Sequence, residues 1–131
     1  MMPTLSRSQL IKLALALPGA FEDYPFNADG DDTLWCTIRH QRTRKIFALI
    51  YERNHTLCIN LKCDPPTAEA LRESWECIQP GFHMNKKHWI TVLMDGSLNR
   101  HQIATLIERS YQLAATPKIT PGPLDFDQTT A

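Results

Sequence analysis

Two cysteines and two histidines have the residue types and the spacing of a zinc site. Cys58 and Cys63 form a C-x4-C pair, and His83 and His88 form an H-x4-H pair. The stretch between the two pairs is longer than the ~12–15 residues of a zinc finger. Cys58 and Cys63 also have opposite parity in an extended segment, so their side chains should point to opposite faces of a sheet. We therefore predict neither a metal site nor a cofactor.

A cysteine–histidine pair, such as Cys63 with His83, is a second chemistry that these residue types allow. No neighbouring group marks an activated thiolate, however, and the chain has neither a glycine-rich phosphate loop nor a G-x-S-x-G motif. The four cysteines, three of them in apolar runs, are predicted to be reduced and largely buried thiols. This usage is typical of a cytoplasmic protein, and we predict no catalytic residue.

Basic residues form two clusters that contain no acidic residue. One spans Thr33 to Tyr51 and includes RHQRTRK, and the other spans Cys77 to Met94 and includes PGFHMNKKHW. Lys and Arg side chains neutralise phosphates and aromatic faces stack on bases, so two such clusters can flank a nucleic acid. The formal net charge of the whole chain is +0, so a nucleic-acid partner is indicated by local clustering alone.

Acidic residues gather in FEDYPFNADGDD, residues 21–32. The segment contains Glu22, Asp23, Asp29, Asp31 and Asp32 and no Lys or Arg. Clustered carboxylates suit a hard cation such as calcium, but this segment lacks the rest of an EF-hand loop and its distal glutamate. We predict a solvated acidic loop here.

The elements that must position these residues follow from composition and periodicity. A chain of 131 residues with 43% hydrophobic and 21% charged residues is typical of one soluble globular domain. Its apolar runs fall well short of the ~20 residues that span a membrane. Helices are predicted from Ser6 to Leu17, from Asp64 to Trp75 and after Ser97, which should cap the last helix.

Four strands are predicted, at Thr33–Arg39, Lys45–Tyr51, Thr56–Lys62 and Trp89–Met94. Short linkers join the first three, which should therefore pair as antiparallel hairpins. Antiparallel strands with segregated helices predict an α+β domain of two layers, with the helices packed on one face of the sheet. The domain is expected to cover residues 1–115, and the Pro-rich residues 116–131 to form a flexible tail.

A single layer of helices leaves the other face of the sheet open. That face should present a mixed aromatic and polar set, which suggests a binding surface or a dimer interface. Depending on strand register, the residues expected there are Trp35, Phe47, Tyr51, Asn60, Lys62 and Trp89.

Short strings along residues 5–115 resemble the MmcQ/YjbR family in content and order. They are LPG (17–19), YPF (24–26), KIFALI (45–50), NLKCDP (60–65), LRE (71–73), PGFHMNKKHWITV (80–92), LMDGS (93–97) and SYQL (110–113). The HMNKKHW string is the most specific of these. The resemblance implies an α-β3-α-β2-α fold, with an antiparallel sheet like that of the type III secretion chaperones and a further strand around Glu76–Gln79.

The same resemblance implies DNA binding and brings with it no enzymatic reaction and no cofactor. The sequence departs from the family pattern in two places. The acidic string NADGDD follows Phe26, where relatives commonly have glycine, and this weakens a nucleic-acid interpretation. The string RHQRTR is more basic than a plain connector, and this strengthens it.

Our first hypothesis is therefore a small cytoplasmic module that binds double-stranded DNA and not a membrane. Phosphate and base contacts are expected from Arg39, Arg42, Arg44, Lys45, Lys62, Asn85, Lys86 and Lys87. One alternative is a module that binds a protein partner, or a second copy of itself, through the open sheet face or the end of the last helix. Another is a small anionic-ligand site around His83, His88 and Trp89.

Overall fold

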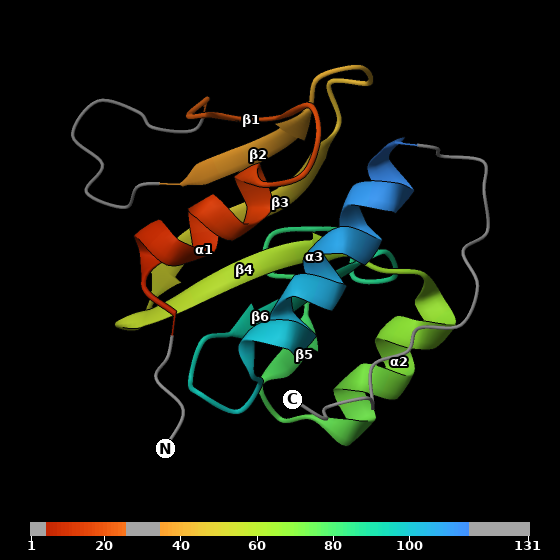
Figure 1. Cartoon of the computed structure of the whole chain (residues 1–131). Helices are drawn as coiled ribbons and strands as arrows, with labels where there is room; N and C mark the ends of the chain where they lie inside the picture. Colours follow the sequence, from red (N-terminus) through yellow and green to blue (C-terminus); the bar gives the residue numbers. More distant parts are fainter. Residues whose placement is uncertain (1–4, 26–34, 116–131) are drawn as a thin grey trace.

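The computed structural model describes residues 5–25 and 35–115 of the chain (Figure 1). Within them, six strands form one sheet in the order β1-β2-β3-β4-β6-β5, and every neighbouring pair of strands is antiparallel. The elements are α1 (Arg7–Leu15), β1 (Ala20–Asp23), β2 (Cys36–His40), β3 (Ile46–Arg53), β4 (Thr56–Lys62), α2 (Pro65–Ser74), β5 (Ile78–Pro80), β6 (Trp89–Leu93) and α3 (Arg100–Ala115).

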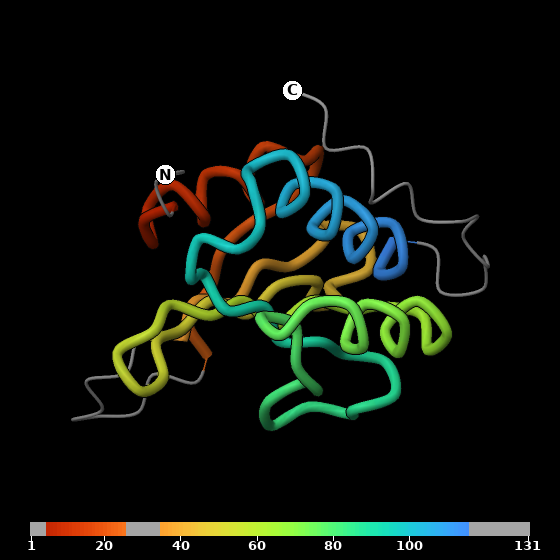
Figure 2. The backbone as a smooth tube through the Cα atoms, turned by 90° about the horizontal axis from the view of Figure 1, so that it is seen from below, coloured from red at the N-terminus to blue at the C-terminus, as the bar shows by residue number. Residues whose placement is uncertain are grey.

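Helices α1 and α3 lie across one face of the sheet, whereas the loop between β5 and β6 lies on the opposite face (Figure 2). Helix α2 packs beside β5 and adds Ala68 and Leu71 to the same hydrophobic core. The core therefore fills the space between the helices and one sheet face. The predicted α+β class, with an antiparallel sheet and one helix layer, is confirmed, as is the strand implied near Glu76–Gln79, which forms β5.

Side-chain parity along the strands agrees with the sequence except at one bulge. Ala48 pairs with Ile38 and Ile46 pairs with Arg39, so Phe47 is an extra residue in β3. The bulge turns Phe47 toward the helices, where its ring meets the edge of Tyr111 at a centroid distance of 5.3 Å. The prediction that Phe47 faces the open side is therefore wrong.

The acidic segment begins as a strand, which the sequence did not indicate. Residues Ala20–Asp23 form β1 and pair with β2. The Thr37 hydroxyl donates to the Asp23 carbonyl at 2.8 Å, and the Arg39 guanidinium lies 2.9 Å from the Asp23 carboxylate. The solvated-loop prediction is thus wrong for Glu22 and Asp23, because a basic neighbour holds the acid in the sheet. The predicted acids Asp29, Asp31 and Asp32 lie outside the described residues.

The sequence predicts that Ser97 caps the last helix, but the structure shows that Asn99 caps it. The Gln102 N–H donates to the Asn99 side chain at 2.8 Å, and the Asn99 N–H donates to the Gln102 side chain at 3.0 Å. Ser97 instead belongs to a turn in which its N–H donates to Asp95. The predicted cap of the first helix, Ser6 with Gln9, is confirmed.

The prediction of buried cysteine thiols is confirmed. All four cysteines are free and buried, and burial raises the pKa of each thiol, in the case of Cys63 to about 12. No helix in the described part of the chain combines the length and the apolar character needed to cross a bilayer. The predicted tail, residues 116–131, lies outside the described residues.

An ion pair joins the start of α2 to α3. The Arg109 guanidinium, 7% exposed, donates to the Asp64 carboxylate at 3.0 Å, and the Thr67 hydroxyl donates to the same carboxylate at 2.6 Å. Partial burial opposes ionisation of Asp64, but the hydrogen bonds from Thr67 and Arg109 outweigh it and hold the pKa of Asp64 below its usual value. The charged carboxylate therefore stabilises the contact between the two helices.

We expect Asp64→Asn to lower the free energy of unfolding at neutral pH by about 2 kcal/mol, because it weakens hydrogen bonds to a charged group. A carboxyl whose pKa is depressed by folding contributes stability above its unfolded pKa, ~4, and loses it as the pH falls through the folded value. The difference between the two proteins in urea denaturation should therefore shrink as the pH falls below about 4. Glu69→Gln, on the exposed side of α2, is the control. A constant difference across this range would contradict the assignment.

Candidate ligand site on the open sheet face

The loop between β5 and β6, residues 81–88, is fastened to the sheet by one buried asparagine. Asn60, in the middle of β4, is fully buried, and its Nδ2 donates to the Phe82 carbonyl at 2.9 Å. Its Oδ1 accepts from the Tyr51 hydroxyl and from the Thr91 hydroxyl, each at 2.7 Å. Thr91 in turn accepts from the Phe82 N–H at 2.8 Å. Strands β3, β4 and β6 thus hold the loop through one network.

This network is satisfied internally and stays in one protonation state. Burial is the main cause that raises the pKa of Tyr51, to about 12, so its hydroxyl remains a hydrogen-bond donor at neutral pH. The three oxygen acceptors of the network, on Asn60, Thr91 and Phe82, and its amide donor all have partners, as buried polar groups require. The network therefore positions the loop and offers no unpaired group to a ligand.

The loop also depends on close backbone contacts. A Cβ atom placed on Gly81 would come within 2.7 Å of the Trp89 Cβ, so only glycine lets the two ends of the loop approach this closely. The Gly81 N–H donates to the Trp89 carbonyl at 3.0 Å. Within the loop, the Lys86 ammonium donates to the Gly81 carbonyl at 2.7 Å, and the Lys87 N–H donates to the Asn85 side chain at 2.9 Å.

Aromatic rings stack at one end of this face. Trp35 lies flat on Tyr51, with ring centroids 4.1 Å apart and planes 10° apart. The Phe82 ring lies 5.9 Å from Tyr51, and the Arg53 guanidinium covers it at 3.9 Å. His83 has a φ of +60°, which is unusual for a residue with a side chain, and its ring lies 4.0 Å from Phe82 and 6.3 Å from Trp35.

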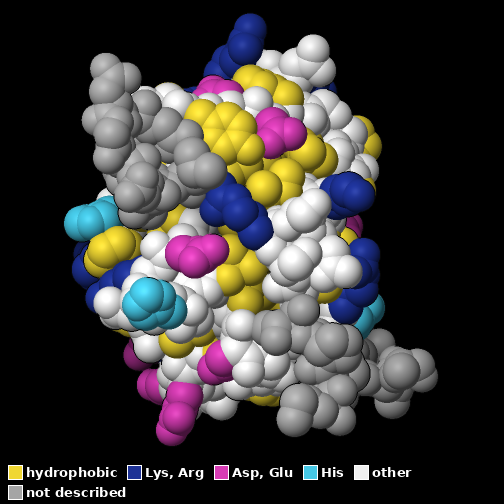
Figure 3. Space-filling model, turned by 90° about the vertical axis from the view of Figure 1, so that its left-hand side faces the viewer, with side chains coloured by type: hydrophobic (Ala, Val, Ile, Leu, Met, Phe, Trp, Pro, Cys, Tyr) yellow, Lys and Arg dark blue, Asp and Glu magenta, His cyan; other side chains and the backbone are white. Residues whose placement is uncertain are grey.

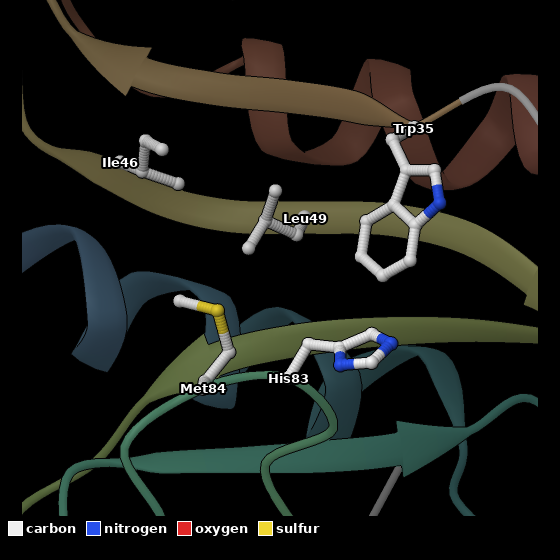
Figure 4. A pocket seen from close by; sticks show the side chains of 5 residues that line it. All are labelled: Trp35, Ile46, Leu49, His83 and Met84. Atoms are coloured by element: carbon white, nitrogen blue, oxygen red, sulfur yellow. The ribbon is translucent and has the colours of Figure 1, made fainter. Parts of the chain in front are cut away.

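A slot of about 260 Å³ runs between strand β3 and this loop. Figure 4 shows Ile46 and Leu49 of β3 on one side, Met84 and His83 of the loop on the other, and Trp35 at one end. Apart from the imidazole of His83, the lining is aliphatic, aromatic or thioether. Backbone strain at a residue that lines a cavity is typical of functional sites, and the slot is thus the candidate site.

A lysine pair stands beside the Ile46 end of the slot. Lys62 follows Leu61, the partner of Ala48 in β3, and has the parity of Asn60, so it lies on the face that carries the loop. Its ammonium is 5.7 Å from the centre of the Trp89 ring. Burial, and secondarily the charge of Lys45, lower the pKa of Lys62. An anion placed there would relieve the repulsion between the two ammonium groups.

The structure divides the predicted nucleic-acid-binding residues into two groups. Arg39 is paired with Asp23, and Lys86 and Asn85 hold the loop. These three side chains therefore have structural partners within the domain. The remaining cations of the predicted set, all exposed or partly exposed, are Arg42, Arg44, Lys45, Lys62 and Lys87.

Charged side chains of both signs share one side of the molecule (Figure 3). On the face that Figure 3 shows, Lys and Arg side chains are interspersed with Asp and Glu side chains. Arg42, Arg44 and Lys45 are adjacent in the turn between β2 and β3. Whether they bind duplex DNA stays a prediction.

The three residues of the predicted anionic-ligand site lie in different surroundings. The His83 ring lines the slot. The His88 side chain is exposed, and its backbone carbonyl accepts from the Cys63 N–H at 2.9 Å. Trp89 is 8% exposed and faces Lys62, outside the main core cluster. The site that the structure describes is thus centred on His83, and His88 contributes backbone structure.

Cys63 and His83, the pair considered for nucleophilic catalysis, lie on opposite sides of the sheet. Cys63 belongs to the core on the helix side of the sheet, whereas Cys58 has the opposite parity, as the sequence predicts. Within residues 5–25 and 35–115, no group of three or more His, Cys, Asp and Glu side chains is arranged to hold a metal ion.

The comparisons with known proteins place this architecture in a family. A family model described as YjbR matches residues 15–113. Escherichia coli YjbR is 35% identical over 107 residues, which cover 82% of this chain and 85% of that protein. Bacillus subtilis YyaQ is 29% identical over 119 residues, covering 83% and 98%.

Among solved structures, the crystal structure of Deinococcus radiodurans protein DR2400 is similar. It has a TM-score of 0.74 and 32% sequence identity, and the match covers 91% of this chain and 85% of that one. A Pseudomonas syringae protein has a TM-score of 0.72 and 32% identity, covering 84% and 99%. These names state no ligand or activity, so a function for this chain has to be argued from its own residues.

We expect Asn60→Ala to lower the free energy of unfolding by about 3 kcal/mol, because the Tyr51 and Thr91 hydroxyls and the Phe82 carbonyl lose buried partners. Guanidinium denaturation measures this loss. Asn85→Ala removes only the exposed hydrogen bond from the Lys87 N–H within the same loop, so it should cost less than about 1 kcal/mol. Equal losses in the two variants would mean that the buried network does not hold the loop.

Proposed function

This chain belongs to the YjbR family, and we propose that it is a binding module that holds the apolar part of a negatively charged ligand in the slot on its open sheet face. The observation that carries the proposal is the juxtaposition of an apolar slot, lined by Ile46, Leu49 and Met84, with a lysine pair at its end. Ligand sites in proteins commonly combine a mostly apolar lining with a few polar groups that fix orientation.

The apolar lining supplies the affinity in this proposal. Burying one aliphatic or aromatic group is worth about 1.5–3 kcal/mol. The rings of Trp35 and His83 add flat faces on which an aromatic group can stack. The Asn60 network keeps the loop wall in place before any ligand arrives, which reduces the ordering cost of binding.

The lysine pair supplies the preference for negative charge. Lys62 is half-buried, so its interaction with an anion is less screened by water than that of a fully exposed lysine. Lys45 is exposed at the start of β3 and adds a second positive charge. A ligand with an apolar body and an anionic end matches both parts of the site.

We expect an anilinonaphthalene sulfonate dye, an aromatic anion, to bind this face with a rise in its fluorescence. Lys62→Met keeps the length of the side chain but removes the charge, and should weaken binding about five- to tenfold, since ~1 kcal/mol of electrostatic attraction is lost. Ile46→Glu places an acid beside the slot and should weaken binding further.

The matched control is Lys12→Met, on the exposed side of α1 and away from this face. It should bind the dye like the wild-type chain. Circular dichroism of each variant checks folding. Dye binding that is equal in Lys62→Met, Ile46→Glu and wild type would exclude the slot as the site.

A second candidate function, duplex-DNA binding, is favoured by the turn between β2 and β3. Arg42, Arg44 and Lys45 are all exposed there, and no acidic residue lies between residues 35 and 51. Lys62, on the neighbouring strand β4, extends this positive group. We propose that any contact with DNA phosphates is made by this turn and not by the Lys86 side chain, which hydrogen-bonds to the Gly81 carbonyl.

If this second function holds, the double variant Arg42→Gln, Lys45→Gln should weaken binding to a labelled duplex and lower the slope of log affinity against log salt by about 2. Fluorescence polarisation at several salt concentrations gives the slope. The control is Lys12→Gln with Arg100→Gln, two exposed cations outside the turn. Absence of binding at low salt, or an unchanged slope, would rule out this turn as a phosphate contact.

A further inference from the structure

Three chain segments in and around the slot carry no negative charge. Residues 35–51 supply its β3 side, residues 56–63 supply β4, and residues 77–94 supply the loop and β6, and none of the three segments contains Asp or Glu. They do carry lysines beside the slot. Lys45 and Lys62 stand at its Ile46 end, and Lys87 is exposed on the loop wall. The acid of the neighbouring strand on this face, Asp23 of β1, is paired with Arg39. The surroundings of the slot therefore favour a partner with several negative charges.

The interior of the slot favours an apolar side chain over a nucleic-acid base. A base has polar edges that lose their hydrogen bonds to water when buried. The lining offers polar atoms only on His83 and on the indole of Trp35, because the nearby amide and hydroxyls of the Asn60 network are satisfied by one another. A phenyl or isobutyl group needs no such partner. At about 260 Å³, the slot is also smaller than the ~300–1,000 Å³ of pockets for drug-sized ligands.

We infer that the slot takes an acidic peptide segment that presents one or two large apolar side chains between aspartates or glutamates. This inference rests on the proposed function and names the partner. The apolar side chain of the peptide enters between Leu49 and Met84, and its flanking carboxylates lie near Lys45, Lys62 and Lys87. Short-range charge attraction on both sides of an apolar anchor gives affinity and orientation together.

The chain itself contains a sequence of this type, which supplies a probe. Residues 122–129 read GPLDFDQT, with Leu124 and Phe126 beside Asp125 and Asp127. A fluorescein-labelled peptide of this sequence can be titrated with the full-length chain in a polarisation assay. Two altered peptides separate the contributions: Phe126→Ala removes the apolar anchor, and the pair Asp125→Asn, Asp127→Asn removes the charge.

We expect the unaltered peptide to bind, and each altered peptide to bind at least about fivefold more weakly. Lys62→Met in the protein should weaken binding of the unaltered peptide and abolish most of the difference made by its aspartates, whereas Lys12→Met should change neither. Ile46→Glu puts an acid at a half-buried position of β3, so thermal denaturation checks that this variant folds. If Ile46→Glu does not fold, the binding data for Lys62→Met alone decide whether the peptide binds at the slot.

A competing segment within the same chain is tested separately. The full-length double variant Leu124→Ala, Phe126→Ala is titrated with the labelled peptide beside the wild type. Tighter binding of the peptide to this variant would support the inference, because it would show that residues 124–126 of the wild type compete with the peptide. If the peptide binds neither protein while the sulfonate dye still binds at the slot, the peptide inference falls and the proposed function stands. If the dye does not bind at the slot either, both the peptide inference and the proposed function are overturned. Equal binding of the charged and uncharged peptides would also overturn the inference.

Discussion

The structure of the open sheet face depends on the hydrogen bonds of one buried side chain, the amide of Asn60. It lies at the centre of β4 and joins hydroxyl groups from β3 and β6 to the backbone of the loop that follows β5. A polar group in that position is costly unless it has all its partners. Because it has them, the loop covers part of a sheet face that would otherwise be exposed to water, and a slot forms between the loop and β3.

The remaining features of the site follow from the position of this loop. The loop can approach β6 closely because residue 81 is glycine, and it places His83 in a left-handed conformation against Phe82 and Trp35. It also leaves the Lys62 side chain on a partly buried surface beside Trp89. An apolar slot and an adjacent positive group are therefore products of one packing arrangement, which explains why a single ligand with both characters fits the face.

Sequence periodicity was sufficient for most of the fold. Alternation along residues 56–62 correctly separates Leu57, Ile59 and Leu61 from Cys58, Asn60 and Lys62, and the short linkers correctly predict hairpins. The errors are local. Strand β1 is short and acidic, and it is held by an ion pair to Arg39 that no pattern of apolar residues reveals. The reversed orientation of Phe47 comes from a bulge, which depends on tertiary packing against Tyr111.

The site was less predictable than the fold. The sequence identified His83, Lys62 and the string HMNKKHW, and it placed Trp35 on the open face. It did not identify Ile46, Leu49 and Met84 as a lining, because aliphatic residues in a strand are indistinguishable from core residues by type. It also assigned a partner-facing role to Lys86, which stays a prediction, and it did not indicate that the Lys86 ammonium hydrogen-bonds to the Gly81 carbonyl. The only sequence signal for this hydrogen bond was a short loop with a glycine at its start and a lysine five residues later.

The most direct test of the central claim, that this slot is a binding site, is a methyl and indole NMR titration with the aromatic sulfonate. We expect the largest shift changes on the Met84, Ile46 and Leu49 methyl groups and on the Trp35 indole, with small changes for Ala104 and Leu113 of α3. Changes concentrated on the helix side, or none at saturating probe, would contradict it.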